Sequence, residues 1–209
     1  MEKRTKELIK SGIILSIIIL MFIAASYITQ RYFEQIKSII GGGVIGMVIY
    51  VLLNIIEVII VPVNLLPIIA IASNLWGGFI AAILTIIGWS IGAIIAFMLA
   101  RKYGIDLVKK FVPIEKINKI EKRISSEHIF WSLVILRIVL PSDIVSYALG
   151  LFSKIKERDY ILATIMGFTP LAFFLAYLGT LPVKYQIIGF IVIGIILIIG
   201  FYINPKRKE

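Results

Sequence analysis

Long apolar segments separated by short basic ones constrain the fold of this chain more than any other feature. Four uninterrupted segments lie at about residues 11–28, 79–100, 160–179 and 185–203. Each is close to the ~20 residues that an α-helix needs to cross the hydrocarbon core of a bilayer. With 60% apolar residues and a mean hydropathy of +1.01, the chain has more apolar surface than a soluble domain buries. We therefore expect an all-α integral membrane protein whose first apolar segment is an uncleaved helix and not a signal peptide.

Two further apolar regions are interrupted by proline. Region 44–76 contains Pro62 and Pro67, and region 129–152 contains Pro141. Proline removes a backbone donor and breaks a helix. In lipid, the carbonyl groups that it frees need partners inside protein or in a water-filled cavity. We therefore predict that each region is a re-entrant hairpin, in which two half-helices meet at the break and return to the same side.

The distribution of basic residues supports this topology. If the N-terminus is cytoplasmic and both broken regions are re-entrant, 18 of the 22 Lys and Arg residues lie in the inner segments. The outer segments hold three, Arg31, Lys37 and Lys184. This bias follows the positive-inside rule, and turning either hairpin into a full span would weaken it. We expect a prokaryotic inner-membrane protein with both termini in the cytoplasm, and we attribute the net charge of +10 to orientation and not to nucleic-acid binding.

The two broken regions resemble each other. Residues 54–77 and 132–150 each contain a charge, a proline four or five residues later, and an apolar run that ends in glycine. Hairpins that enter from opposite faces form an inverted repeat, an architecture typical of transporters with a site near the midplane. The predicted organisation is an N-terminal tail, transmembrane helix and short outer segment (1–39), a two-repeat domain (40–182, repeats 40–104 and 126–182, joined by the amphipathic segment 105–125), and a C-terminal transmembrane helix with a basic tail (183–209).

Glu57 and Arg137 stand at corresponding positions of the two hairpins, just before the breaks. Charges at membrane depth are costly and therefore pair with one another or face a cavity. One interpretation is a Glu57–Arg137 salt bridge that holds the hairpins together. The other is that Arg137 binds a substrate anion, with phosphate favoured because a guanidinium offers a planar set of donors. Glu57 is then a counter-ion or proton carrier.

Polar and small residues near the breaks complete the candidate site. Ser142 and Asp143 follow Pro141 and can cap the second half-helix, whose positive dipole end suits an anion. Asn64 is the matching polar candidate in the first hairpin. Five further residues are assigned to helix packing and not to substrate: Gly88, Gly92, Gly150, Gly167 and Pro170.

Several kinds of chemistry have no residues to support them. The chain has no cysteine and a single histidine, which excludes disulfides, thiol catalysis and a multi-histidine metal site. Residues 41–46 match G-x-G-x-x-G, but no strand precedes them, so the nucleotide-binding interpretation fails. We expect no metal and no cofactor. We also expect no enzymatic activity, because no nucleophile–base set is present.

Residues 136–170 resemble the second-half signature of the DedA superfamily, and more closely its VTT-domain branch, also called SNARE-associated Golgi proteins. That signature has an arginine, a proline, an apolar half-helix with glycine and a helix bearing Gly-x-x-Pro; here these are Arg137, Pro141, Gly150 and Gly167–Pro170. The first half fits through VPVNLLPIIAIASNLWG and a Phe-x-x-Ala-Arg ending. The resemblance covers about residues 40–182.

This resemblance implies two re-entrant hairpins in an inverted repeat and the movement of lipids across bilayers. Eukaryotic members scramble phospholipids, and bacterial members recycle undecaprenyl phosphate or another anionic lipid. Glu57 would match the acidic residue of the first hairpin and Arg137 the arginine of the second. DedA-type members carry a second acidic residue where this chain has Asn64 and a second arginine where it has Asp143. These departures weigh against proton-coupled polyprenyl-phosphate transport.

We therefore expect a flippase or scramblase that moves a phosphate-bearing lipid, a phospholipid or a polyprenyl phosphate, without ATP. One alternative is a transporter for a small solute or ion, with protons as a candidate coupling ion. The other is a structural protein that organises the membrane. Homo-oligomerisation is compatible with each of these.

Overall fold

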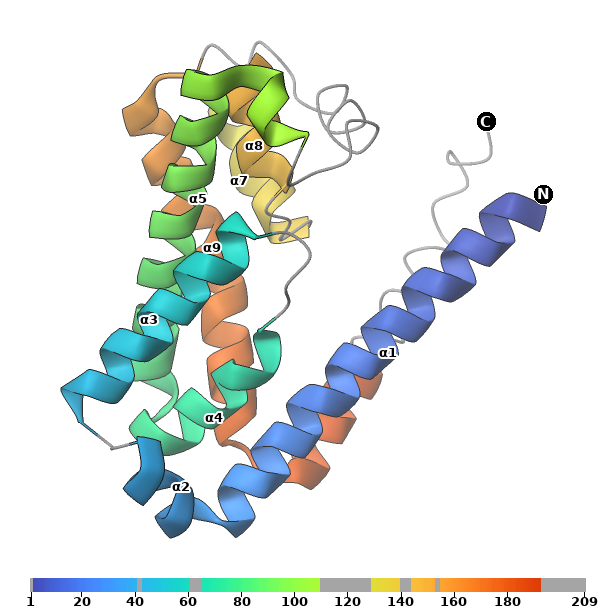
Figure 1. The fold of residues 1–209 in the computed structure, drawn as a ribbon. Coiled ribbons are helices and arrows are strands. Elements are labelled where there is room, and N and C mark those ends of the chain that lie inside the picture. Colours follow the sequence, from blue (N-terminus) through green and yellow to red (C-terminus); the bar gives the residue numbers. More distant parts are fainter. Residues whose placement is uncertain are drawn as a thin grey trace.

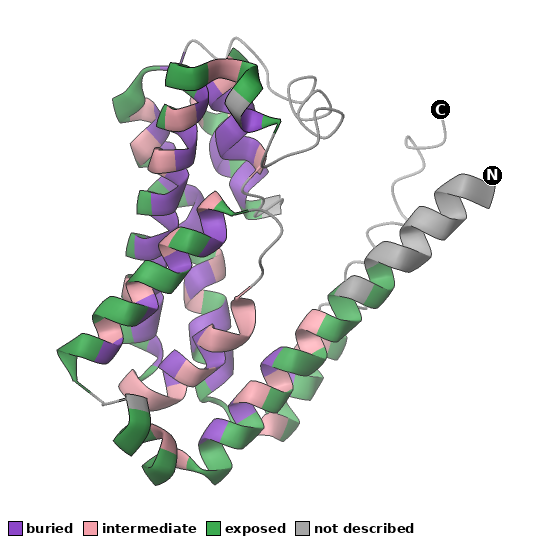
Figure 2. Cartoon of the chain, in the orientation of Figure 1, coloured by how far each residue is buried: buried purple, intermediate pink, exposed green. Residues whose placement is uncertain are grey.

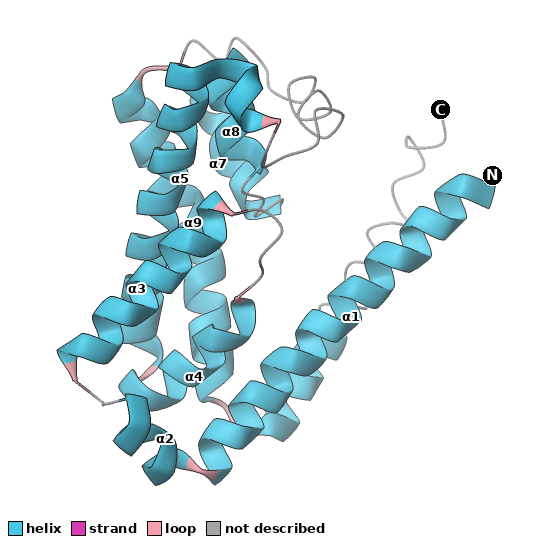
Figure 3. Cartoon of the chain, viewed as in Figure 1, coloured by secondary structure: helices cyan, strands magenta, loops and turns pink. Residues whose placement is uncertain are grey.

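The computed structural model describes residues 2–40, 43–60, 65–109, 129–139, 144–152 and 155–192. Within these ranges all regular structure is helical (Figures 1 and 3), which confirms the predicted all-α class. Five predicted site residues lie outside the described residues: Pro62, Asn64, Pro141, Ser142 and Asp143. The helices are α1 (Glu2–Arg31), α2 (Phe33–Ile40), α3 (Val44–Ile59), α4 (Leu66–Trp76), α5 (Gly78–Val108), α7 (Ile129–Val139), α8 (Ile144–Phe152), α9 (Glu157–Thr180) and a final described helix, Val183–Val192.

Two helices, α5 and α9, are long and apolar enough to cross a membrane, as the sequence predicts for residues 79–100 and 160–179. A third candidate span consists of Leu15–Arg31 together with Phe33–Ile39, which are bent by 94° at their junction. The fourth predicted span begins in helix Val183–Val192, and its later residues lie outside the described part of the chain.

The N-terminal region is helical over most of its length. Helix α1 begins at Glu2, within the predicted cytoplasmic tail, and a separate helix, α2, lies within the predicted outer segment. The amphipathic pattern of α2 is short: Phe33, Ile36 and Ile39 recur at helical spacing, and the Lys37 ammonium lies over the Phe33 ring, 5.5 Å from its centroid. Eight residues are too few for hydropathy to reveal this helix, because two turns carry little periodic signal.

The half-helices of the first hairpin and those of the second lie at opposite ends of the bundle. Figure 1 shows α3 and α4 in its lower half and α7 and α8 in its upper half, with α5 and α9 running through both. In each half the first half-helix packs on the long helix that follows it, α3 on α5 and α7 on α9. The second half-helices are exchanged, because α4 packs on α9 and α8 packs on α5. This arrangement fits an inverted repeat. Re-entry itself stays a prediction, because residues 61–64 and 140–143 lie outside the described ones.

Glycines stand where these helices approach most closely. A Cβ on Gly88 would lie 2.5 Å from the Cβ of Asn54, and a Cβ on Gly167 would lie 2.5 Å from the Cβ of Arg137. At the exchanged crossing, a Cβ on Gly150 would overlap the Phe97 carbonyl oxygen. Real Cβ atoms do not approach other atoms this closely, so only glycine permits these backbone separations. Gly92 has the same property, with the Ile55 carbonyl oxygen at 2.8 Å.

The outward faces of the bundle are apolar. Figure 2 shows that α1 and α3 are exposed along their outer sides, and the exposed residues include Val44, Ile45 and Leu52. Exposed apolar surface on this scale marks contact with a membrane or a partner. Together with the two spanning helices, it indicates a chain solvated by lipid.

Candidate functional site

Arg137 is fully buried in the last turn of α7. Its Nη2 donates to Ser146 Oγ on α8 at 2.8 Å and to Tyr160 Oη on α9 at 2.9 Å. The centre of the guanidinium group lies 4.5 Å from the centroid of the Phe168 ring. Tyr160 in turn links α9 to α5, because its hydroxyl donates to the Ala93 carbonyl oxygen at 3.0 Å. Arg137 therefore connects both limbs of the second hairpin to the two long helices.

The other two nitrogen atoms of the Arg137 guanidinium group donate no hydrogen bond to a described residue. Nε and Nη1 are buried and have no hydrogen-bond partner among the described residues. A guanidinium group has five N–H donors and stays protonated. The three donors on Nε and Nη1 therefore have no described partner, although the group that carries them is permanently charged. The nearby helix α9 adds Thr164, whose buried hydroxyl also lacks a partner within the described ranges. This arrangement can bind an anion, because it combines a positive charge with unused donors in a low-dielectric interior.

Glu57 is buried near the end of α3 and accepts hydrogen bonds within its own half. Its Oε1 accepts from the backbone N–H of Leu65, the residue that precedes α4, at 2.7 Å. Its Oε2 accepts from Trp89 Nε1 of α5 at 3.4 Å. Glu57 thus holds the two limbs of the first hairpin together across the break.

The salt-bridge interpretation does not describe this structure. Glu57 and Arg137 are both described residues, and no ion pair within 4.0 Å joins them; the ion pair found in the described part of the chain is Lys109–Asp106. Two aromatic rings lie between the charged groups instead. Trp89, which donates to Glu57, packs against Phe168, which faces Arg137, with ring centroids 5.4 Å apart.

The structure places Arg137 in register with Asn54, not with Glu57. Gly88 faces the Asn54 side chain and the Val51 carbonyl oxygen, and Gly167 faces the Arg137 side chain and the Val134 carbonyl oxygen. Each glycine therefore meets a polar residue and the carbonyl three positions before it. Glu57 lies one turn beyond this crossing. The sequence analysis matched Arg137 with Glu57 by their spacing to the proline. That spacing does not determine which face of a half-helix meets the long helix, so the correspondence with Asn54 was not predicted.

Asn54 is a site residue that the sequence analysis did not single out. It is buried, its Nδ2 donates to the Tyr50 carbonyl oxygen at 2.8 Å, and its Oδ1 has no partner among the described residues. An amide inside the apolar stretch VLLNIIEV was the available signal.

Two tyrosines were also missed. Tyr160 joins Arg137 to α5, as described above, and Tyr147 Oη donates to the Ile59 carbonyl oxygen at 2.7 Å. This second bond links α8 of one hairpin to the end of α3 of the other. Tyrosine in an apolar segment is common at membrane interfaces, so its sequence gave no reason to expect a buried role.

A second polar cluster fastens the flanking helices to the domain. Ser26 of α1 accepts from Gln186 Nε2 at 2.6 Å, and both side chains are buried. Asn74 of α4 donates to the Gly179 carbonyl oxygen at 2.9 Å, and Gln30 donates to the Leu181 carbonyl oxygen at 3.0 Å. These bonds join α1, α4, α9 and helix Val183–Val192. No group of three or more His, Cys, Asp or Glu side chains that could hold a metal ion occurs among the described residues.

Comparison with known proteins gives one match. A family model described as the VTT domain matches residues 61–181, which extend from the first break through α9. No curated protein and no solved structure matches the chain. The matched range is more than half of the chain and includes Arg137, Trp89 and Phe168. It confirms the resemblance to the VTT-domain branch of the DedA superfamily, and the chain belongs to the VTT domain family.

Proposed function

We propose that this protein moves a phosphate-bearing lipid between the leaflets of a prokaryotic inner membrane, with Arg137 binding the phosphate. The observation that carries this proposal is the buried guanidinium with two nitrogen atoms that no described residue uses. Among the described residues this permanent charge has no ion-pair partner, and an unpaired charge is costly to bury, so its position calls for a functional explanation. Membership of the VTT domain family favours transport over catalysis.

The surroundings of Arg137 favour an anion over a cation or a neutral solute. Its Nη2 is held by Ser146 and Tyr160, which orients the remaining donors. A phosphate offers several acceptor oxygens and matches a guanidinium better than a halide or a carbonyl group does. Glu57 is the proposed counter-ion or proton carrier. It is the buried acidic residue of the opposite hairpin, beyond the Trp89–Phe168 pair, and its carboxylate would balance the charge of Arg137 once the substrate has left.

The proposed orientation has both termini in the cytoplasm. Arg101, Lys102 and Lys109 lie at the end of α5, and Arg158 lies in the first turn of α9, at the same end of the bundle in Figure 1. Lys37 of α2 lies at the opposite end. This asymmetry supports the orientation through the positive-inside rule.

The test is a leaflet-exchange assay in proteoliposomes with a labelled glycerophospholipid and labelled undecaprenyl phosphate. The wild type should exchange at least one lipid, and Arg137→Ala should abolish that exchange while remaining folded in detergent. Arg158→Ala is the matched control, because Arg158 is an exposed arginine on the helix that contacts Arg137.

Two results would contradict the proposal. The first is an absence of exchange of both lipids by the wild type, with and without a pH gradient; uptake of small solutes would then be measured. The second is full exchange by folded Arg137→Ala.

A further inference from the structure

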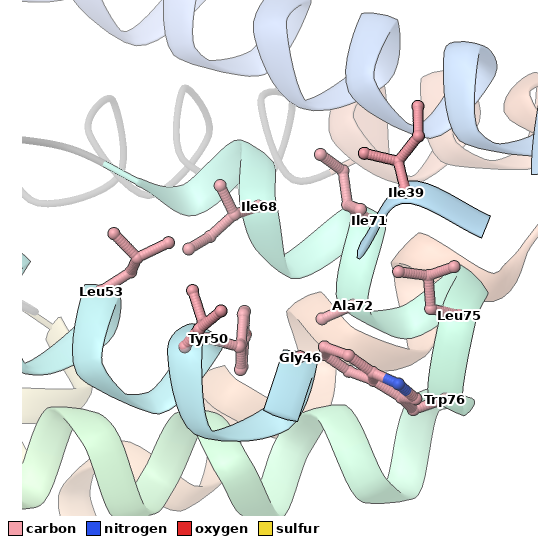
Figure 4. A pocket seen from close by; sticks show the side chains of 10 residues that line it. Ile39, Gly46, Tyr50, Leu53, Ile68, Ile71, Ala72, Leu75 and Trp76 are labelled. Carbon is pink, nitrogen blue, oxygen red and sulfur yellow. The ribbon is translucent and has the colours of Figure 1, made fainter. Parts of the chain in front are cut away.

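A cavity of about 330 Å³ lies between α2, α3 and α4, away from Arg137 (Figure 4). Its size is at the lower end of the range for small-molecule sites. Its walls come from all three helices, and apart from Gly46 every residue that lines it has an aliphatic or aromatic side chain. The residues that matter below are Ile39 of α2, Gly46, Tyr50 and Leu53 of α3, and Ile68 and Trp76 of α4.

The cavity is elongated along the first hairpin. On α3 its lining residues run from Gly46 to Leu53, and on α4 they run from Trp76 back to Ile68. Seven residues of α-helix correspond to roughly 10 Å at 1.5 Å per residue. Figure 4 shows Ile39, Gly46 and Trp76 toward one end and Leu53 and Ile68 toward the other. The shape is therefore that of a groove suited to a chain and not to a compact solute.

Helix α2 indicates the depth at which this groove begins. It is bent by 94° from α1 and is amphipathic, with Glu34 and Lys37 exposed. An amphipathic helix that crosses the end of a spanning helix lies in the plane of the lipid headgroups. The groove thus runs from headgroup depth, beside Ile39, toward the break of the first hairpin.

We propose that this groove binds one acyl chain of a glycerophospholipid, with the lipid headgroup at the depth of α2. Leu53 and its neighbour Leu52 are exposed on the lipid-facing side of α3, so the groove is continuous with surface that acyl chains reach. The apolar walls disfavour a polar solute, and the volume is too small for a helix of a second chain, whose diameter is about 10 Å. Helix α2 also carries the exposed Lys37, whose ammonium group lies over the Phe33 ring and supplies a positive charge at headgroup depth.

This inference rests on the proposed function in one respect: the groove would receive the tail of the lipid whose phosphate later reaches Arg137. Binding in the groove can nevertheless be measured without transport. The failure of one proposal is therefore distinguishable from the failure of the other.

The test is photo-cross-linking of the full-length protein in detergent micelles with phosphatidylglycerol that carries a diazirine in one acyl chain. Labelled peptides are mapped by mass spectrometry as unlabelled phosphatidylglycerol is added. We expect saturable labelling of residues 46–53 and 68–76. Leu53→Trp should fill the groove and lower this labelling about tenfold, a loss of ~1.4 kcal/mol in affinity. Leu52→Trp is the matched control, because Leu52 is the same residue type on the same helix but does not line the groove.

Equal labelling in Leu53→Trp and Leu52→Trp would overturn the inference, and so would labelling that excess phospholipid does not compete. Competition by a polyprenyl phosphate but not by phosphatidylglycerol would also overturn it. Arg137→Ala should keep the groove labelling and lose exchange. If exchange by Leu53→Trp stays normal while its labelling is lost, the groove binds lipid but does not serve the transport site, which would overturn the link between them and leave the proposed function intact.

Discussion

The two hairpins share an arrangement of helices but differ in whether the buried charged residue of each is fully hydrogen-bonded within the described residues. In the first half, both oxygens of Glu57 accept hydrogen bonds, and the Tyr50 hydroxyl lies 2.6 Å from Thr85 Oγ1. In the second half, Arg137 keeps two nitrogen atoms without described partners. Thr164, which precedes Gly167 by three residues as Thr85 precedes Gly88, also lacks one.

This difference teaches that a symmetric backbone can carry an asymmetric site. Among the described residues, Asn54 Oδ1 of the first half is an acceptor without a partner, at the place where the second half has the unpaired donors of Arg137. Unpaired donors with a positive charge select an anion, whereas a neutral amide oxygen does not. The anion site is therefore expected in the second half, with the first half serving as its support.

The largest expected effect concerns Arg137 itself. Arg137→Met keeps much of the side-chain volume but removes the charge and all donors, so lipid exchange should fall about 10²-fold, the consequence of losing ~2.7 kcal/mol of charged contact. Glu57→Gln keeps an acceptor for Leu65 and should reduce exchange less. Initial exchange rates in proteoliposomes measure both. Equal losses in the two variants would show that the halves contribute equally and would break the asymmetry.

The close helix crossings of the two halves should be equally sensitive to an added side chain. Gly88→Ala and Gly167→Ala each place a Cβ 2.5 Å from another Cβ, so each should lower the free energy of unfolding by about 1–3 kcal/mol through overpacking. Gly12→Ala is the control, since no atom lies within 4 Å of its added Cβ. Thermal unfolding in detergent measures all three. A neutral Gly167→Ala would mean that the crossing of α7 and α9 is looser than that of α3 and α5.

Glu57 should contribute stability as well as chemistry. Glu57→Ala leaves the Leu65 N–H and the Trp89 indole N–H without their acceptor, which should cost about 1–3 kcal/mol for buried unsatisfied donors. Glu57→Gln retains one acceptor and should cost less. Unfolding by sodium dodecyl sulfate in mixed micelles is a suitable measurement. If Glu57→Ala is as stable as the wild type, the carboxylate does not hold the start of α4.

The smallest expected effect is a difference in stability between variants of the two equivalent threonines, Thr85 and Thr164. Thr85→Val removes the hydrogen bond to Tyr50 and should cost about 1 kcal/mol. Thr164→Val removes a hydroxyl without a described partner and should be neutral or slightly stabilising. Melting temperatures of the two variants, compared under the same conditions, test this. Equal destabilisation would show that Thr164 is satisfied in the same way as Thr85.

Part of the site could be predicted from sequence because local signals carried it. Arg137 and Glu57 stood out as charges inside apolar segments, and their burial agrees with the cost of exposing a charge to lipid. Their relationship could not be predicted in this way. A salt bridge and a separate anion site require the same two residues, and only the positions of Trp89 and Phe168 between them distinguish the two.

By itself the sequence determined the class of the fold, the two long spans α5 and α9, the family, and the candidate charges. These properties depend on hydropathy, segment length and residue type, all of which are local. Only the tertiary structure decided that Arg137 lies in register with Asn54, that Tyr160 links it to α5, and that Ile39 of α2 lines a groove along the first hairpin. Each of these depends on which face of one helix meets another, and in an apolar segment of a membrane protein nearly every face is hydrophobic, so the sequence pattern does not specify the contact.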